Sequence, residues 1–161
     1  MVERFPAFEK VVRRARQFSE ARVKPVGGLH PFDERNIHPK MPLLVRNLFD
    51  NGHYAQATFE AYKFIDNEIQ RHSASVETGF KLMMQVFALE APLIQLTPLH
   101  TTSEKDEQKG FQFIFAGSVL AIRNPRGHKF GIIDSPDKCL DHLSLASMLL
   151  RRLDEAGYKT A

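Results

Sequence analysis

Apolar residues recur at intervals of three and four along most of this chain, and no long period-two alternation competes with them. The clearest run is Met41, Leu44, Val45, Leu48 and Phe49, the spacing of an amphipathic helix. Comparable runs occupy residues 54–73, 79–89, 103–122 and 135–157. The sequence therefore predicts an all-α fold, an up-and-down bundle of about five to six helices.

The first 38 residues differ in character from the rest. A basic helix is expected from about Ala7 to Glu20, and between Met1 and Lys24 seven basic residues face three acidic ones. Such an arm suits binding to polyanions, but it also suits a solvated helix face. The stretch KPVGGLHPFDERNIHPK, with three prolines and two adjacent glycines, reads as an irregular connector. We expect residues 1–38 to form this helix and connector and residues 39–161 to form the bundle domain.

Composition excludes several classes of protein. The single cysteine, Cys139, allows no internal disulfide and no four-cysteine zinc site. No apolar run approaches the roughly 20 residues that cross a bilayer, and the first residues do not resemble a secretory signal. The histidines lack the spacing and the neighbouring carboxylates of a metal site. We therefore expect a cytoplasmic protein with no membrane partner, no metal and no cofactor.

The helix from residue 103 has the most explicit start. Ser103 followed by Asp106 reads as a capping box. The expected buried stripe of this helix consists of Phe111, Ile114, Phe115, Ser118, Val119 and Ile122. Pro125 lacks an N–H and disfavours helical angles at Asn124, so the helix is expected to end there.

The helix end falls in the sequence VLAIRNPRGHKFGI, residues 119–132. Arg123 is expected on the last turn and His128 just beyond it. An arginine offers a permanently charged fork for phosphate oxygens, and a histidine can exchange a proton near neutral pH. Asn124 could orient the histidine or the phosphate. Together these residues fit the cleavage of an RNA backbone.

Spacing alone leaves another interpretation open. A cation on the last turn of a helix is favourable because of the helix dipole. A similar number of residues lies between Arg46 and His53. With twelve arginines and seven histidines, about one or two such pairs are expected in the sequence by chance.

The motif RNPRGH resembles the signature of the HEPN superfamily of small helical bundles, in which an arginine, usually followed by a polar residue, precedes a histidine by four to six intervening positions. More narrowly, the chain resembles the prokaryotic Ymh family. Three segments carry that resemblance in order: residues 48–66, residues 103–128 and residues 143–156.

The resemblance implies a metal-independent endoribonuclease. Active superfamily members dimerise so that two arginine–histidine pairs line one cleft, and many are toxins or phage-defence effectors. Arg123 would then stabilise the scissile phosphate, His128 would act as acid or base, and Asn124 would assist. RNA, a second copy of the chain and an antitoxin or defence protein are the expected partners. The alternatives are a non-catalytic HEPN module that binds nucleic acid, nucleotide or protein, and a plain dimerisation bundle.

Four further residues are expected at the substrate site: Arg126, Lys129, His53 and Glu60. Glu60 has two interpretations, since it could pair with Lys63 in solvent or point inward and hold Arg123. His53 could lie at the rim of the cleft or serve only as a polar residue in a turn. The Phe-rich stretch at residues 111–115 is expected in the core or at a dimer interface.

Overall fold

The computed structural model describes residues 28–129 and 131–161. Contacts divide the chain into two units, residues 1–30 and 31–161. The basic helix expected from Ala7 to Glu20 lies outside the described residues. We describe the second unit by itself.

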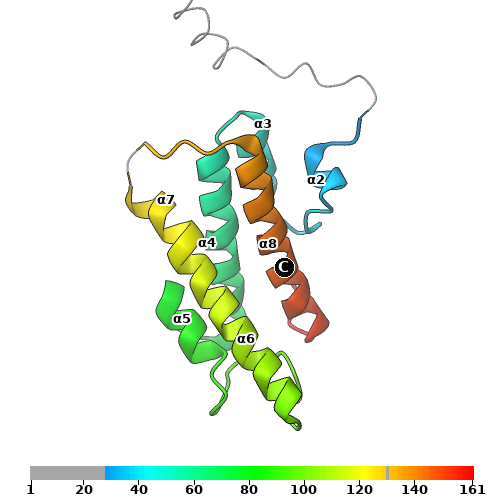
Figure 1. The fold of residues 1–161 in the computed structure, drawn as a ribbon, viewed down its shortest axis with the longest axis vertical. Helices are drawn as coiled ribbons and strands as arrows, with labels where there is room; N and C mark the ends of the chain where they lie inside the picture. The colour runs from blue at the N-terminus through cyan, green and yellow to red at the C-terminus, as the bar shows by residue number, and fades with distance from the viewer. Residues whose placement is uncertain (1–27, 130) are drawn as a thin grey trace, which may run out of the picture. The chain divides into compact units, whose positions relative to one another are not determined.

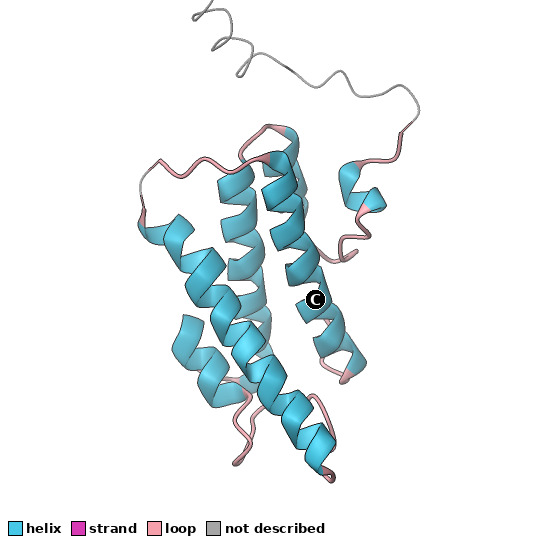
Figure 2. Ribbon diagram, in the orientation of Figure 1, coloured by secondary structure: helices cyan, strands magenta, loops and turns pink. Residues whose placement is uncertain are grey.

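All regular structure among the described residues is helical (Figure 2). Helix α4 contacts α3, α5, α7, α8 and the π-helical turn η1. The long helices α4, α6 and α8 alternate in direction along the chain (Figure 1). This arrangement confirms the predicted helical bundle. The elements are α2 (Pro31–Glu34), α3 (Leu43–Asp50), α4 (Tyr54–Ser73), α5 (Gly79–Val86), α6 (Thr102–Ser118), η1 (Val119–Arg123), α7 (Asn124–His128) and α8 (Pro136–Glu155).

The segment expected to be an irregular connector contributes to the core. Phe32 lies on the short helix α2, and both Phe32 and Ile37 are buried against α3, α4 and α8. His38 is also buried, and its Nε2 lies 3.0 Å from Asp154 Oδ2 near the end of α8. The two apolar side chains in this stretch explain the difference, because their burial fixes the backbone despite the prolines.

The predicted helix ends are largely present. Gly52 has φ +79°, and the N–H groups of Gly52 and His53 bond to Phe49 and Leu48 carbonyls, as in a Schellman motif. The Ser135 hydroxyl accepts the Lys138 N–H at 3.2 Å and so caps α8.

The capping box of α6 lies two residues earlier than expected. The Thr101 hydroxyl accepts the Glu104 N–H, and the Glu104 carboxylate accepts the Thr101 N–H. The prediction of Ser103 with Asp106 was therefore wrong. The reciprocal bond needs a side chain as long as glutamate at the third helical position, and aspartate is shorter.

The buried face of α6 also differs from the prediction. Phe115, Ser118, Val119 and Ile122 are buried as expected, but Ile114 is exposed and Phe111 is only partly buried. Two glutamines take the remaining inward positions. Gln108 bonds to the backbone of Phe87, Ile94 and Leu96, and Gln112 donates to the Met84 carbonyl. Apolar periodicity could not identify these positions, because buried backbone groups select a polar partner.

No helix among the described residues is long and apolar enough to cross a membrane. The same part of the chain contains no group of three or more histidine, cysteine, aspartate or glutamate side chains placed as metal ligands.

Candidate active site around Arg123 and His128

The chain does not leave the helix at Pro125, contrary to the prediction. Asn124 has helical angles, φ −62° and ψ −42°, and α7 continues to His128. The π-helical turn η1 makes this possible, with the Asn124 N–H bonded to the Val119 carbonyl. A wider turn relaxes the contact between the proline ring and the carbonyl four residues before it. Arg123 therefore lies at the end of η1, and His128 is the last residue of α7.

The Arg123 side chain lies between α4, α5 and η1. Its Nη2 is 3.8 Å from Asp66 Oδ2 on α4, and its guanidinium lies 5.6 Å from the centre of the Phe59 ring. Nη1 donates to the Asn124 side-chain oxygen at 3.3 Å. Asn124 thus contacts the arginine, and it makes no hydrogen bond to His128.

Most hydrogen-bonding capacity of Arg123 is unused within the described chain. A guanidinium has five N–H donors, and the bond to Asn124 is the only hydrogen bond of this side chain among the described residues. Its Nε is buried without a partner there. The side chain is 25% exposed, so a ligand from solvent can reach it. This combination suits a site that completes its bonding with an anion.

Asp66 is the acidic partner that the sequence analysis missed. Its carboxylate is only 5% exposed, and Oδ2 accepts the N–H of Gly79 at the start of α5. Burial raises the pKa of Asp66, although the Arg123 charge and the Gly79 hydrogen bond oppose that shift. Asp66 follows Tyr62 by four residues and precedes Ile69 by three, and both are buried. An acidic residue at this inward spacing was the available signal.

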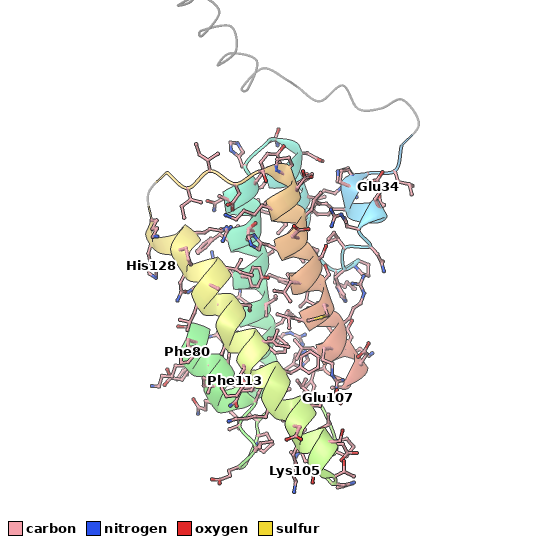
Figure 3. The ribbon with its side chains drawn as sticks, in the orientation of Figure 1. Glu34, Phe80, Lys105, Glu107, Phe113 and His128 are labelled. Carbon is pink, nitrogen blue, oxygen red and sulfur yellow. The ribbon has the colours of Figure 1, made fainter. Side chains whose placement is uncertain are left out.

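His128 is exposed, at the end of α7 (Figure 3). Its ring makes no hydrogen bond or ion pair with the described part of the chain, Arg123 included. The histidine therefore keeps both nitrogens open to an incoming ligand.

Arg126 is held by contacts within the described chain. Its side chain is 4% exposed, and its Nε and Nη2 bond to Asp134 Oδ2 at 2.7 and 2.6 Å. Nη1 donates to the Ile122 carbonyl, and Nη2 lies 3.2 Å from His142 Nδ1. These contacts join α7 to Asp134, just before α8, and to His142 on α8, and they leave Arg126 few donors for the substrate contact that stays a prediction.

The other expected site residues are Lys129, His53 and Glu60, and within the described part of the chain none of them bonds to Arg123 or His128. Lys129 and His53 are exposed, and neither side chain bonds to the described residues. Glu60 accepts from Gln56 at 3.1 Å and lies 3.6 Å from Lys63 Nζ, both on α4. The acid beside Arg123 is thus Asp66, and the interpretation of Glu60 as a partner of Lys63 describes its contacts.

Phe59 and Gly127 complete the centre. A Cβ atom on Gly127 would lie 2.9 Å from Cε2 of Phe59, which is closer than side chains normally approach. Only glycine lets α7 lie so close to this ring. Phe59 is partly buried and lies against Arg123 and Gly127, although the sequence alone did not single it out.

The family of the chain follows from a comparison with protein-family models. A model described as a protein of unknown function, Hypoth_ymh, matches residues 35–153, well over half of the chain. The chain belongs to the Hypoth_ymh family. The Ymh part of the resemblance is thereby confirmed, and the matched range includes Arg123, His128, Asp66 and Phe59. No curated protein and no solved structure matched this Hypoth_ymh chain.

Proposed function

We propose that this Hypoth_ymh protein is a metal-independent endoribonuclease of the HEPN type. The observation that supports the proposal most is the state of Arg123, a partly exposed guanidinium with most of its donors unused. His128 lies open to solvent five residues further along the chain. A phosphate held by Arg123 and a proton acceptor at His128 are the two groups that RNA cleavage needs.

In the proposed reaction, the ribose 2′-oxygen attacks phosphorus and the bond from phosphorus to the 5′-oxygen breaks. His128 takes the proton of the 2′-hydroxyl, or gives a proton to the leaving 5′-oxygen. Arg123 stabilises the negative charge that develops on the phosphoryl oxygens. Water provides the remaining proton transfer, and the products are a 2′,3′-cyclic phosphate and a 5′-hydroxyl.

A homodimer is part of the proposal, and the outer face of α6 supports it. Phe113, Ile114 and Leu120 are 54%, 41% and 50% exposed, and Gly110 and Gly117 lie on the same face. A soluble helix seldom presents three turns of apolar and small residues to water unless a partner covers them. This face leads along the helix toward the motif. Two copies packed about a two-fold axis would bring their motifs to one groove.

The cellular role that we propose is that of a toxin or phage-defence effector, restrained by a partner protein. Expression in bacterial cells should slow growth, and Arg123→Ala or His128→Ala should abolish the effect. The alternative is a non-catalytic HEPN module that binds nucleic acid, nucleotide or protein through the same residues.

The decisive experiment incubates the purified full chain with a mixed RNA substrate in EDTA and analyses the product ends. We expect cyclic phosphate ends from the wild type and none from Arg123→Ala or His128→Ala. Arg46→Ala is the matched control, because Arg46 is the partly exposed arginine of the other Arg–His pair and lies near Asp33.

The outcomes separate the alternatives. Cleavage that persists in both motif variants would overturn the site assignment, and strict dependence on added metal would overturn the mechanism. RNA binding that depends on Arg123 but is never followed by cleavage would favour the non-catalytic module.

A further inference from the structure

The inward-facing positions of α6 and η1 lead to the start of α7. Gln108, Gln112, Phe115, Val119 and Ile122 follow one another at alternating spacings of four and three and are buried. The next residue in this series is Arg126, whose side chain is 4% exposed. Gly127 beside it is exposed, and a Cβ atom there would meet the Phe59 ring of α4.

The π-helical turn carries the helical path through Pro125. The bond from the Asn124 N–H to the Val119 carbonyl spans five residues. On the helix that follows, Arg126 reaches Asp134 and His142, and Gly127, the smallest residue of the motif, meets the Phe59 ring.

Phe59 contacts the motif at two residues, Gly127 and Arg123. Its ring edge meets the backbone of Gly127, and the Arg123 guanidinium lies 5.6 Å from the ring centre. On the same side, a Cβ atom on Gly79 would lie 3.6 Å from Val119 Cγ1 and 3.8 Å from Arg123 Nη1. The Arg123 side chain is thus confined between the aromatic ring, the start of α5 and Asp66, which limits its rotamers before any ligand binds.

We propose that Phe59 is a positioning residue of the Arg123–His128 site. The inference rests on the proposed function for its catalytic consequence. Phe59 touches neither the scissile phosphate nor the attacking oxygen. It acts by holding the Arg123 guanidinium and the α7 backbone in one fixed relation, so that neither group must be ordered when RNA binds.

The first test measures the contact itself and does not depend on any activity. We compare thermal unfolding of the wild type, Gly127→Ala, Phe59→Leu and the double variant. Gly127→Ala should lower the melting temperature, because the added methyl group meets the ring. In the Phe59→Leu background the same change should cost little or raise the melting temperature, because alanine favours helix. An equal loss in both backgrounds would overturn the contact.

A second activity-independent readout reports on Arg123. The side-chain resonances of an arginine over an aromatic face are shifted upfield by the ring. We expect such a signal in the wild type, assigned through Arg123→Lys, and its return to ordinary values in Phe59→Leu. An unshifted Arg123 signal in the wild type would overturn the positioning role.

The catalytic test separates kcat from KM. Phe59→Leu should lower kcat by about 10- to 100-fold while KM changes by less than about threefold, since a misplaced guanidinium loses transition-state charge stabilisation. Phe64→Leu is the matched control, because Phe64 lies on the same helix, is also partly buried and does not contact Arg123. An unchanged kcat in Phe59→Leu would overturn the proposal.

Failure of the proposed function gives a different pattern. The wild type could fail to cleave RNA while the unfolding comparison shows the Gly127–Phe59 contact and the Arg123 resonance is shifted. In that case the ribonuclease assignment fails, and the contacts of Phe59 with Arg123 and Gly127 stand as a structural feature. If RNA is cleaved and Phe59→Leu behaves as Phe64→Leu does, the ribonuclease stands and the positioning role fails.

Discussion

Asp66 is the buried acidic partner of Arg123, and burial affects the protonation of its carboxyl group. Burial raises the pKa of Asp66, so the folded state holds a proton on this carboxyl more readily than the unfolded chain does. A raised pKa means that stability is lost as the pH rises from the unfolded value, about 3.9, through the folded value. Near neutral pH the charged Asp66 carboxylate thus lowers the stability of the fold. Its proposed benefit is that its charge holds the Arg123 guanidinium in place.

The first prediction concerns Asp66→Asn. Asparagine keeps an oxygen for the Gly79 N–H and removes the charge beside Arg123. We expect the free energy of unfolding at pH 7 to stay within about 1 kcal/mol of the wild type or to rise. RNA cleavage should fall about tenfold or more, because Arg123 loses the charge that holds it. Chemical denaturation and initial cleavage rates measure the two effects.

Asp141→Asn is the control for Asp66→Asn, since Asp141 is an exposed acid that pairs with Arg35. Asp141→Asn should change neither the free energy of unfolding nor the rate of RNA cleavage. Full cleavage by Asp66→Asn would show that Arg123 needs no acidic partner.

Asp134 has the opposite behaviour to Asp66. Burial alone would raise its pKa, but hydrogen bonds and charges from Lys138 and Arg126 outweigh burial and lower it. A lowered pKa adds stability that is fully present above the unfolded value near 3.9 and is lost as the pH falls through the folded value. The second prediction is that wild-type stability falls below about pH 4 and that Asp134→Asn flattens this dependence. Urea unfolding between pH 2.5 and 7, in about half-unit steps, tests it. An unchanged slope in the variant would exclude Asp134 as the source.

At the scale of secondary-structure elements, the Arg126–Asp134 pair joins α7 to the segment before α8. Both side chains are almost completely buried, at 4% and 0% exposure. Removing Arg126 leaves the buried Asp134 carboxylate with only Lys138 as a charged partner, and breaking a buried ion pair typically costs about 3–5 kcal/mol. Lys138 also pairs with Asp134 but is largely exposed, and such pairs contribute less than about 1 kcal/mol.

The third prediction follows from this contrast. Arg126→Met should destabilise the protein by about 3 kcal/mol, whereas Lys138→Met should change stability by less than about 1 kcal/mol. Chemical denaturation at pH 7 compares them directly. Equal, small effects would mean that the pair does not hold α7 to α8 in solution.

The same scale shows what the sequence could and could not predict. Periodicity identified the helices from residue 41 onward, because burying apolar side chains on one face is a local property of the chain. It could not identify Gln108, whose position is set by backbone groups of Phe87, Ile94 and Leu96, distant in sequence. Nor could it identify the π-helical turn η1 and the helix α7 that follows it, since a proline normally indicates a helix end.

The sequence also indicated only part of the candidate site. The motif located Arg123 and His128, whereas Asp66, Phe59 and the inward turn of Arg126 depend on which helices pack together. Arg126, a basic residue three positions from Arg123, was expected to contact substrate. Only the three-dimensional structure reveals that the buried Asp134 carboxylate binds the Arg126 guanidinium.

At the scale of the whole molecule, the outer face of α6 is the feature that the single chain does not satisfy. Phe113 and Ile114 on α6 and Leu120 on the adjoining η1 are exposed, although the inward face already carries buried apolar side chains. Lys109 lies over the Phe113 ring, with its Nζ 4.9 Å from the centre, and covers part of that side chain only. A second copy of this face offers the complementary surface that a two-fold contact requires.

The fourth prediction is that Leu120→Asp converts a dimer into a monomer. A buried charge opposite its own symmetry mate is unfavourable twice in one interface. Light scattering coupled to size-exclusion chromatography should give a dimer for the wild type at micromolar concentration and a monomer for the variant. Because Leu120 is half exposed in the single chain, the variant should keep the helical circular-dichroism spectrum of the wild type.

Leu43→Asp is the matched control, since Leu43 on α3 is 69% exposed and lies away from the α6 face. It should leave the molar mass unchanged. If cleavage depends on a shared groove, Leu120→Asp should also lose activity, and the loss should be reversed in part at high protein concentration, where residual association is favoured. A wild type that is monomeric at every concentration while still cleaving RNA would separate catalysis from dimerisation and would require each Arg123–His128 pair to act alone.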